Sequence, residues 1–151
     1  MENISKHITY KEATRSEAAN RENLDNTPDA EQLKNMKALA MYIFEPLRIW
    51  VGGPIRINSF FRAPDVNVAV GGSTTSQHCK GQAFDLDDTF GHKTNAEMFH
   101  YIKDNLDFDQ MIWEYGDDTN PDWVHVSFKS NGQNRKQLLR KEKGKKYEPW
   151  Q

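Results

Sequence analysis

The stretch from Ser76 to Asp85 holds residues whose types and spacing could do chemistry. His78 and Asp85 stand seven residues apart, with Gly81 between them. Glycine lets the backbone turn sharply, so a loop histidine and a strand aspartate can point at the same spot. Imidazole nitrogen and carboxylate oxygen are both ligands that zinc accepts in proteins. His78 and Asp85 are therefore two candidate metal ligands.

His125 is the candidate for a third ligand. It alternates with Val124 and Val126, so in a strand its imidazole faces away from both valines. Two imidazoles and one carboxylate suit Zn2+, and three protein ligands leave a fourth position open, as catalytic sites do. The single cysteine, Cys79, excludes a multi-cysteine zinc site. The expected cofactor is therefore one zinc ion held by histidine and carboxylate.

Strands are expected to position these residues. Alternation of apolar and polar residues, or enrichment in β-branched and aromatic residues, predicts strands at 55–61, 82–87, 110–115 and 123–128. Turn formers between the last two predict an antiparallel hairpin with a long loop. Residues 134–140 are a candidate edge strand. In the second strand, Asp85 lies on the face opposite Phe84 and Leu86, so its carboxylate is expected to face a cleft while the apolar face meets the core.

Helices are expected to cover the apolar face of the sheet. A long helix should begin at Thr27-Pro28 and end between Pro46 and Trp50, because apolar residues recur at helical spacing: Leu33, Met36, Ala40, Ile43 and Leu47. A short helix is expected at 64–70, and Thr94 with Glu97 forms a capping box that opens another. The fold class is therefore α+β: an antiparallel sheet with helices on one face and the zinc cleft on the other.

Composition restricts the class of protein. The 151 residues, 36% of them apolar, fit one domain spanning 1–151, and we expect a monomer. The formal net charge of -2 argues against nucleic acid as the main partner. No apolar run is long enough for membrane insertion. The polar opening lacks the apolar stretch of a signal peptide, so we expect synthesis in the cytoplasm.

Four short blocks of residues follow one another in an order that resembles a known group of enzymes. The blocks contain Ser59, Arg62, Asn67 and Gly71-Gly72; then Ser76, His78, Gly81, Ala83 and Asp85; then Asp109-Gln110 through Glu114; and finally Trp123, His125 and Ser127. They match the patterns S-x-x-R…N…GG, S-x-H-x-x-G-x-A-x-D, D-Q-x-x-x-E and W-x-H-x-S. In these blocks the chain resembles the zinc D-alanyl-D-alanine carboxypeptidases and L,D-endopeptidases, which share their fold with the hedgehog signalling domain.

The resemblance implies roles for individual residues. It makes His78, Asp85 and His125 the metal ligands and a carboxylate near the last histidine the general base. Two candidates compete for that base: Glu114 at the end of its strand, which we favour, and Asp122, three residues before His125.

Three further residues are expected at the cleft. By the same resemblance, Arg62 binds the substrate carboxylate or the developing oxyanion. Ser76 is expected to brace its loop by hydrogen bonding and is also a candidate contact to substrate. Trp123 is expected to flank the cleft.

The resemblance also implies a substrate, the peptidoglycan stem peptide with its D-amino acids, and hydrolysis of one of its amide bonds at the bacterial cell wall. A phage lysis enzyme, or endolysin, is the most economical setting, and a bacterial remodelling enzyme is the other. Whether the enzyme is a D,D-carboxypeptidase or an endopeptidase stays open. The alternative function is a non-catalytic, zinc-containing module of the same fold that binds cell wall or protein, followed by a structural tail or scaffold protein.

Overall fold

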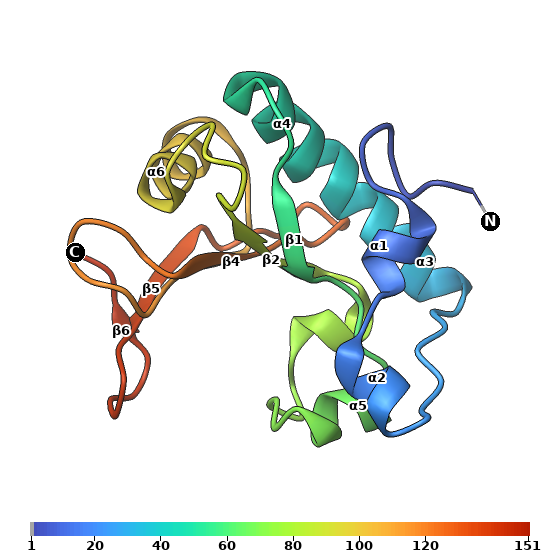
Figure 1. Cartoon of the computed structure of the whole chain (residues 1–151). Helices are drawn as coiled ribbons and strands as arrows, with labels where there is room; N and C mark the ends of the chain where they lie inside the picture. Colours follow the sequence, from blue (N-terminus) through green and yellow to red (C-terminus); the bar gives the residue numbers. More distant parts are fainter. Residues whose placement is uncertain (1) are drawn as a thin grey trace.

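The computed structural model describes residues 2–151, and a six-stranded sheet runs through its centre (Figure 1). The strands are β1 (Arg56–Ser59), β2 (Ala83–Asp87), β3 (Gln110–Glu114), β4 (Trp123–Ser127), β5 (Gln137–Lys141) and β6 (Glu148–Pro149). Their order across the sheet is β1-β2-β4-β3-β5-β6. The four expected strands and the hairpin of β3 and β4 are therefore present.

The expectation of an antiparallel sheet is wrong for one pair of strands. β5 runs parallel to β3, with Gln110 opposite Gln137, and it is not an edge strand because β6 pairs with it. The direction follows from the path of the chain. β4 ends beside the start of β3, where the amide of Asp109 donates to the carbonyl of Ser127 (2.8 Å). The chain then crosses to the free edge of β3, so β5 starts at the same end as β3.

The helices are α1 (Tyr10–Thr14), α2 (Glu17–Arg21), α3 (Ala30–Leu39), the π-helical turn η1 (Ala40–Phe44), α4 (Glu45–Val51), α5 (Pro64–Ala69), the 3-10 turn η2 (Gln77–Lys80) and α6 (Asn95–Asn105). The expected long helix is α3, η1 and α4 in succession. It begins at Ala30, not at Thr27-Pro28, because Asp29 and Gln32 form a capping box. It ends at Val51, where Gly52 takes the left-handed conformation (φ 80°).

The π-helical turn η1 ends two residues before Pro46. Proline has no amide hydrogen, and its ring clashes with the carbonyl four residues earlier in a regular α-helix. The wider turn relieves that clash, and the amide of Glu45 accordingly donates to the carbonyl of Ala40, five residues back. The apolar stripe continues through the irregularity, since Ala40, Ile43 and Phe44 are all buried.

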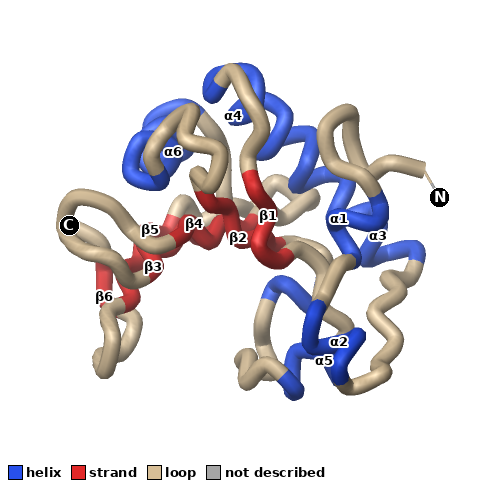
Figure 2. Tube along the Cα trace, viewed as in Figure 1, coloured by secondary structure: helices blue, strands red, loops and turns tan. Residues whose placement is uncertain are grey.

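Helices lie on both sides of the sheet (Figures 1 and 2). The long helix and α6 cover the upper side in Figure 1, whereas α2 and α5 lie on the other side, so the expectation of helices on one face is incomplete. The main core lies between the sheet and the first group. Phe84 of β2 is fully buried there and meets the ring of Phe44 edge-on, with the ring centres 6.0 Å apart. Within residues 2–151, no helix is both long and apolar enough to cross a bilayer.

Candidate active site

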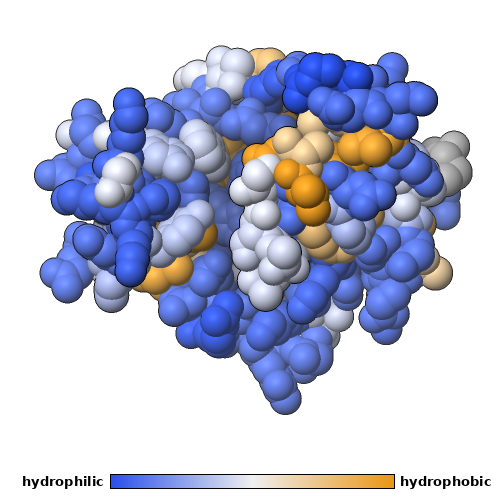
Figure 3. Space-filling model, turned by 90° about the horizontal axis from the view of Figure 1, so that it is seen from below, coloured by the Kyte–Doolittle hydropathy of each residue, from blue (hydrophilic) through white to orange (hydrophobic). Residues whose placement is uncertain are grey.

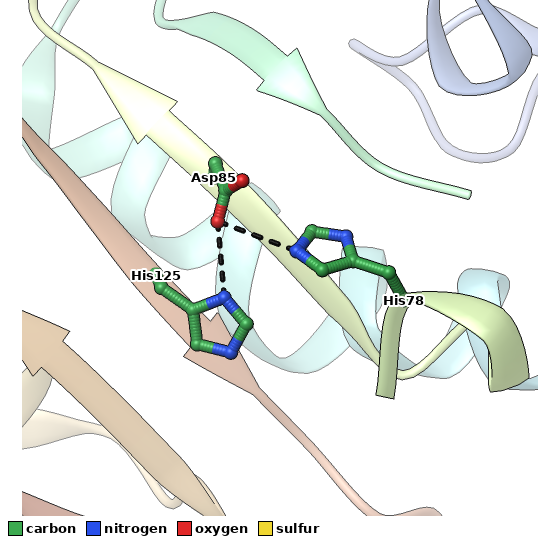
Figure 4. A group of neighbouring side chains, drawn as sticks. All are labelled: His78, Asp85 and His125. Carbon is green, nitrogen blue, oxygen red and sulfur yellow. Dashed lines mark hydrogen bonds and ion pairs between the residues drawn. The ribbon is translucent and has the colours of Figure 1, made fainter. Parts of the chain in front are cut away.

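Three ligand-type side chains converge on the face of the sheet opposite the main core (Figure 4). Asp85 of β2 and His125 of β4 are direct partners across the two strands, so their side chains share a face. Oδ1 of Asp85 lies 3.0 Å from Nδ1 of His125 and 3.4 Å from Nε2 of His78. One ligand atom from each residue lies within 4.8 Å of the other two. This spacing allows all three to contact a single ion.

The orientation of the His78 ring is fixed by the backbone. Nδ1–H of His78 donates to the carbonyl oxygen of Phe60 (2.7 Å), which leaves Nε2 with a lone pair directed at Asp85. Histidine ligands commonly donate their other ring nitrogen in this way, because the hydrogen bond sets both tautomer and direction. The ring is also buried, with 2% of the residue exposed. His78 is thus held ready to bind a metal through Nε2.

Packing of α3 against η2 places His78 in this position. Gly81 has φ 73°, and a Cβ atom there would lie 2.5 Å from the backbone oxygen of Gln32 and 2.8 Å from Cγ of Met36. Only glycine therefore fits, both for its conformation and for the close approach of α3. The side chain of Gln32 also donates to the carbonyl of Cys79 (3.0 Å). The glycine in the sequence pattern thus has a packing role in addition to the expected turn.

The protonation states of two residues suit metal binding. Burial lowers the pKa of His78 below its ordinary value, which keeps the imidazole neutral. Burial alone would raise the pKa of Asp85, but the neighbouring His78 and the hydrogen bond with Nδ1 of His125 hold it well below its usual range. A neutral imidazole and an ionised carboxylate are the forms that bind zinc. With two nitrogens and one oxygen at these spacings, the donor set fits one Zn2+ ion.

A cavity of about 720 Å³ opens over the three residues. Figure 3 shows this face of the molecule, which is largely hydrophilic with a recess near its middle. Glu114, Arg62, Ser76 and Trp123 all line the cavity, as do His78, Asp85 and His125. The structure therefore brings nearly every expected site residue to one place.

Glu114 is a buried carboxyl in this cavity, with 6% of the residue exposed. Burial is the main cause that raises its pKa, to about 7, and the charge of Asp85 adds to the effect, while His125 and Lys141 oppose it. A carboxyl with a pKa near neutrality can both accept and release a proton at physiological pH. This property suits a general acid and base.

A family model described as Peptidase M15 matches residues 6–127. The chain belongs to the peptidase M15 family. M15 peptidases are zinc-dependent, so membership and the group of His78, Asp85 and His125 together indicate a zinc metallopeptidase. No curated protein matches the chain. The match to the M15 model ends at Ser127, before β5 and β6.

Asp122, the other candidate base, lies away from the M15 site. Its side chain is exposed and borders a second pocket, lined by Tyr115, Gly116, Arg140, Glu142 and Lys143. Its backbone amide donates to the carbonyl of Glu114 (2.8 Å). Asp122 precedes β4, whose first residue, Trp123, lines the site cavity. Of the two carboxyls, only Glu114 is placed beside the candidate ligands.

The remaining expected residues surround the candidate ligands of this M15 peptidase. Arg62 lies beside His78, with its amide donating to the carbonyl of His78 (3.3 Å), and its buried Nε has no hydrogen-bond partner among residues 2–151. Ser76 caps η2 by accepting a hydrogen bond from the amide of His78 (3.2 Å). Trp123 packs beside Tyr115, with ring centres 5.3 Å apart. The bracing role expected for Ser76 is therefore observed.

The cavity also contains residues to which the sequence assigned no role at the site, among them Gln110, Ile112, Lys129, Arg135, Leu139 and Tyr147. Strand alternation with Glu114 could have identified Gln110 and Ile112, since the three share one face of β3. The others depend on how the chain after Ser127 folds back over the sheet. No local pattern signals that path.

Proposed function

We propose that this M15 protein is a zinc-dependent peptidase of the hedgehog/D,D-peptidase fold that hydrolyses an amide bond in peptidoglycan stem peptides. The observation that carries the proposal is the convergence of His78, Asp85 and His125 in a cavity that also holds the carboxyl of Glu114. A metal-binding module would not need a buried carboxyl with a pKa near 7 in the same cavity as the candidate ligands. An amide hydrolase does need one.

Each residue of the candidate site would have its own role in hydrolysis. His78, Asp85 and His125 would hold zinc, which when bound acts as a Lewis acid and makes water nucleophilic at neutral pH. Glu114 would take a proton from the attacking water and pass it to the leaving amine nitrogen. Arg62 would bind the substrate carboxylate or the developing oxyanion through its guanidinium. Ser76 and Trp123 would border the bound peptide.

The proposed setting is the bacterial cell wall, where the enzyme would act as a phage endolysin or a bacterial remodelling enzyme. The support for peptidoglycan is the resemblance of the four sequence blocks to carboxypeptidases and endopeptidases of cell-wall peptides. The M15 match supports the reaction class.

Digestion of purified peptidoglycan tests the proposal. Zinc-loaded protein is incubated with walls of two stem-peptide types, with and without a chelator, and the soluble products are analysed by mass spectrometry. We expect peptide fragments whose masses identify the cleaved bond, no release with chelator, and recovery when zinc is restored. Zinc-loaded protein that co-sediments with the wall but releases no fragment would overturn the enzyme in favour of a binding module.

A further inference from the structure

Positive charge is concentrated in the cavity. Among the residues that the structure describes, its lining includes four cationic side chains, Arg62, Lys80, Lys129 and Arg135, but only two carboxylates, Asp85 and Glu114. The whole chain has the opposite balance, with a formal net charge of -2. Asp85 would in addition be neutralised by a bound cation. A cleft of one sign of charge attracts ligands of the other sign, so this cavity favours an anionic substrate.

Two of these cations stand apart from the rest. Lys129 and Arg135 follow Ser127, the last residue that the M15 model matches. They lie near Asp109, at the start of β3, whereas Glu114 is at its other end. Arg62 instead lies in the loop between β1 and α5, where its amide donates to the carbonyl of His78. The cavity therefore has a cationic end distinct from Arg62.

Buried Asp109 fixes the position of this cationic end. The carboxylate is fully buried, and it accepts hydrogen bonds from Nε (3.0 Å), Nη2 (2.9 Å) and the backbone amide (3.1 Å) of Arg135. Burial alone would raise the pKa of Asp109, but its hydrogen bonds with Arg135 lower it, so the ion pair persists at neutral pH. Such a bidentate pair orients the guanidinium. Asp109 bonds to Nε and Nη2 of Arg135, so Nη1 can donate to another partner.

Lys129 supplies a second cation that Asp109 neutralises only weakly. Its Nζ lies 3.8 Å from Oδ1 of Asp109, beyond hydrogen-bond distance, and its side chain is 34% exposed. Two cations that line the cavity thus share one carboxylate, which leaves one unit of positive charge without a counter-charge from Asp109. Partial burial strengthens the attraction of that charge for an anion.

We propose that Lys129 and Arg135 form a subsite for a carboxylate of the peptide substrate. This carboxylate is free, and it lies at a distance from the scissile bond. The subsite rests on the proposed peptidase function and adds a substrate preference to it. The enzyme would select peptides with an internal carboxylate over the same peptides with that group amidated. Arg62 and the candidate metal ligands would meet the substrate elsewhere, so the preference is separable from catalysis.

Binding of two synthetic stem peptides tests the subsite. The peptides differ only in whether one internal carboxylate is free or amidated, and each is titrated by calorimetry into the zinc-loaded Glu114→Gln variant, which would bind without turnover. We expect the free carboxylate to bind about tenfold more tightly, the size of a hydrogen bond to a charged group. Adding Lys129→Met to Glu114→Gln should bring the ratio of the two binding affinities close to one. Adding Lys34→Met, which removes an exposed cation on α3, should leave it unchanged.

Several outcomes would overturn the subsite: a ratio near one in Glu114→Gln itself, no measurable binding of either peptide, or a full ratio after Lys129→Met. Lys129→Gln is the second variant should Lys129→Met fail to fold. Arg135 is left intact because its loss would leave the buried carboxylate of Asp109 without its ion-pair partner. Cleavage of both peptides is measured separately with Glu114 present. If the free carboxylate is preferred but neither peptide is cleaved, the subsite stands and the peptidase function is refuted. If the peptides are cleaved but the free carboxylate is not preferred, the peptidase function stands and the subsite is refuted.

Discussion

At the scale of single residues, Glu114 and Asp122 provide a matched pair for testing the proposed base. Glu114→Gln keeps the shape of the side chain but removes its ability to accept a proton. We expect the rate of peptide hydrolysis to fall by about 10²–10⁴, the usual contribution of a general base, while zinc content stays at the wild-type level. Asp122→Asn should retain its rate, because Asp122 borders a different pocket. Loss of turnover in Asp122→Asn with full activity in Glu114→Gln would reverse the assignment.

The raised pKa of Glu114 also makes a prediction about stability in zinc-free protein. Its pKa rises from 4.5 to about 7 on folding, so the unfolded chain loses the proton first as the pH increases. Stability contributed by the protonated form is therefore present below about pH 4.5 and is lost as the pH rises through 7. Glu114→Gln should be the more stable protein above pH 7, by at most about 3 kcal/mol, with no advantage near pH 4.

Thermal unfolding of chelated protein at pH 4 to 8 measures this difference. Glu31→Gln, which changes an exposed carboxyl on α3, is the control and should show no such trend. A constant offset between Glu114→Gln and wild type across this pH range would contradict a titration of Glu114.

The sequence could predict the shared face of Asp85 and His125 because strand alternation is a local rule. The structure pairs these two residues directly across β2 and β4. The sequence could not predict the hydrogen bond from His78 to the carbonyl of Phe60, since the two residues are 18 positions apart. It also gave no sign that Asp109 is buried against Arg135, because that contact requires the chain after β4 to return to the start of β3.

At the scale of elements, Asn95 connects the start of α6 with the segment that leads into β4. The two N–H groups of its Nδ2 are shared among three acceptors, Asp87 (2.9 Å) and the carbonyls of Pro121 (3.1 Å) and Asp122 (3.0 Å), while its Oδ1 accepts from the amide of Asp88 (2.8 Å). Asn95→Ala would leave these buried or partly buried groups without their amide partner. We expect it to lower the free energy of unfolding by about 2–4 kcal/mol.

Urea unfolding of Asn95→Ala measures that loss. Asn105→Ala is the matched control, because within residues 2–151 the exposed side chain of Asn105 bonds only to the carbonyl of Tyr101, one turn earlier in α6. A loss for Asn95→Ala no larger than for Asn105→Ala would show that Asn95 does not secure the approach to β4.

Elements that depend on local capping or alternation were the easiest to predict, and those that depend on chain path were the hardest. Thr94 and Glu97 form the expected capping box at the start of α6. For α3, the sequence predicted a start at Thr27-Pro28, whereas the side chain of Asp29 caps the helix and Ala30 begins it. The parallel pairing of β5 and the short β6 had no local signal, since a strand's direction depends on the loop that precedes it.

At the scale of the whole molecule, a bound metal should stabilise the fold, because its candidate ligands come from η2, β2 and β4. A ligand that binds only the folded state adds about 2.7 kcal/mol at 100 times its dissociation constant. For a chain of this size we expect zinc to raise the unfolding temperature by about 5–10 °C over chelated protein. Asp85→Ala should show little of this rise, and an equal rise in that variant would place the stabilising zinc at another site.

X-ray absorption at the zinc edge, on protein loaded with one equivalent of zinc, tests most directly whether His78, Asp85 and His125 bind one ion. We expect a first shell of nitrogen and oxygen at about 2.0–2.1 Å, with outer-shell scattering from two imidazoles. A sulfur shell at about 2.3 Å, which would make Cys79 a ligand, or scattering from fewer than two imidazoles would contradict the site.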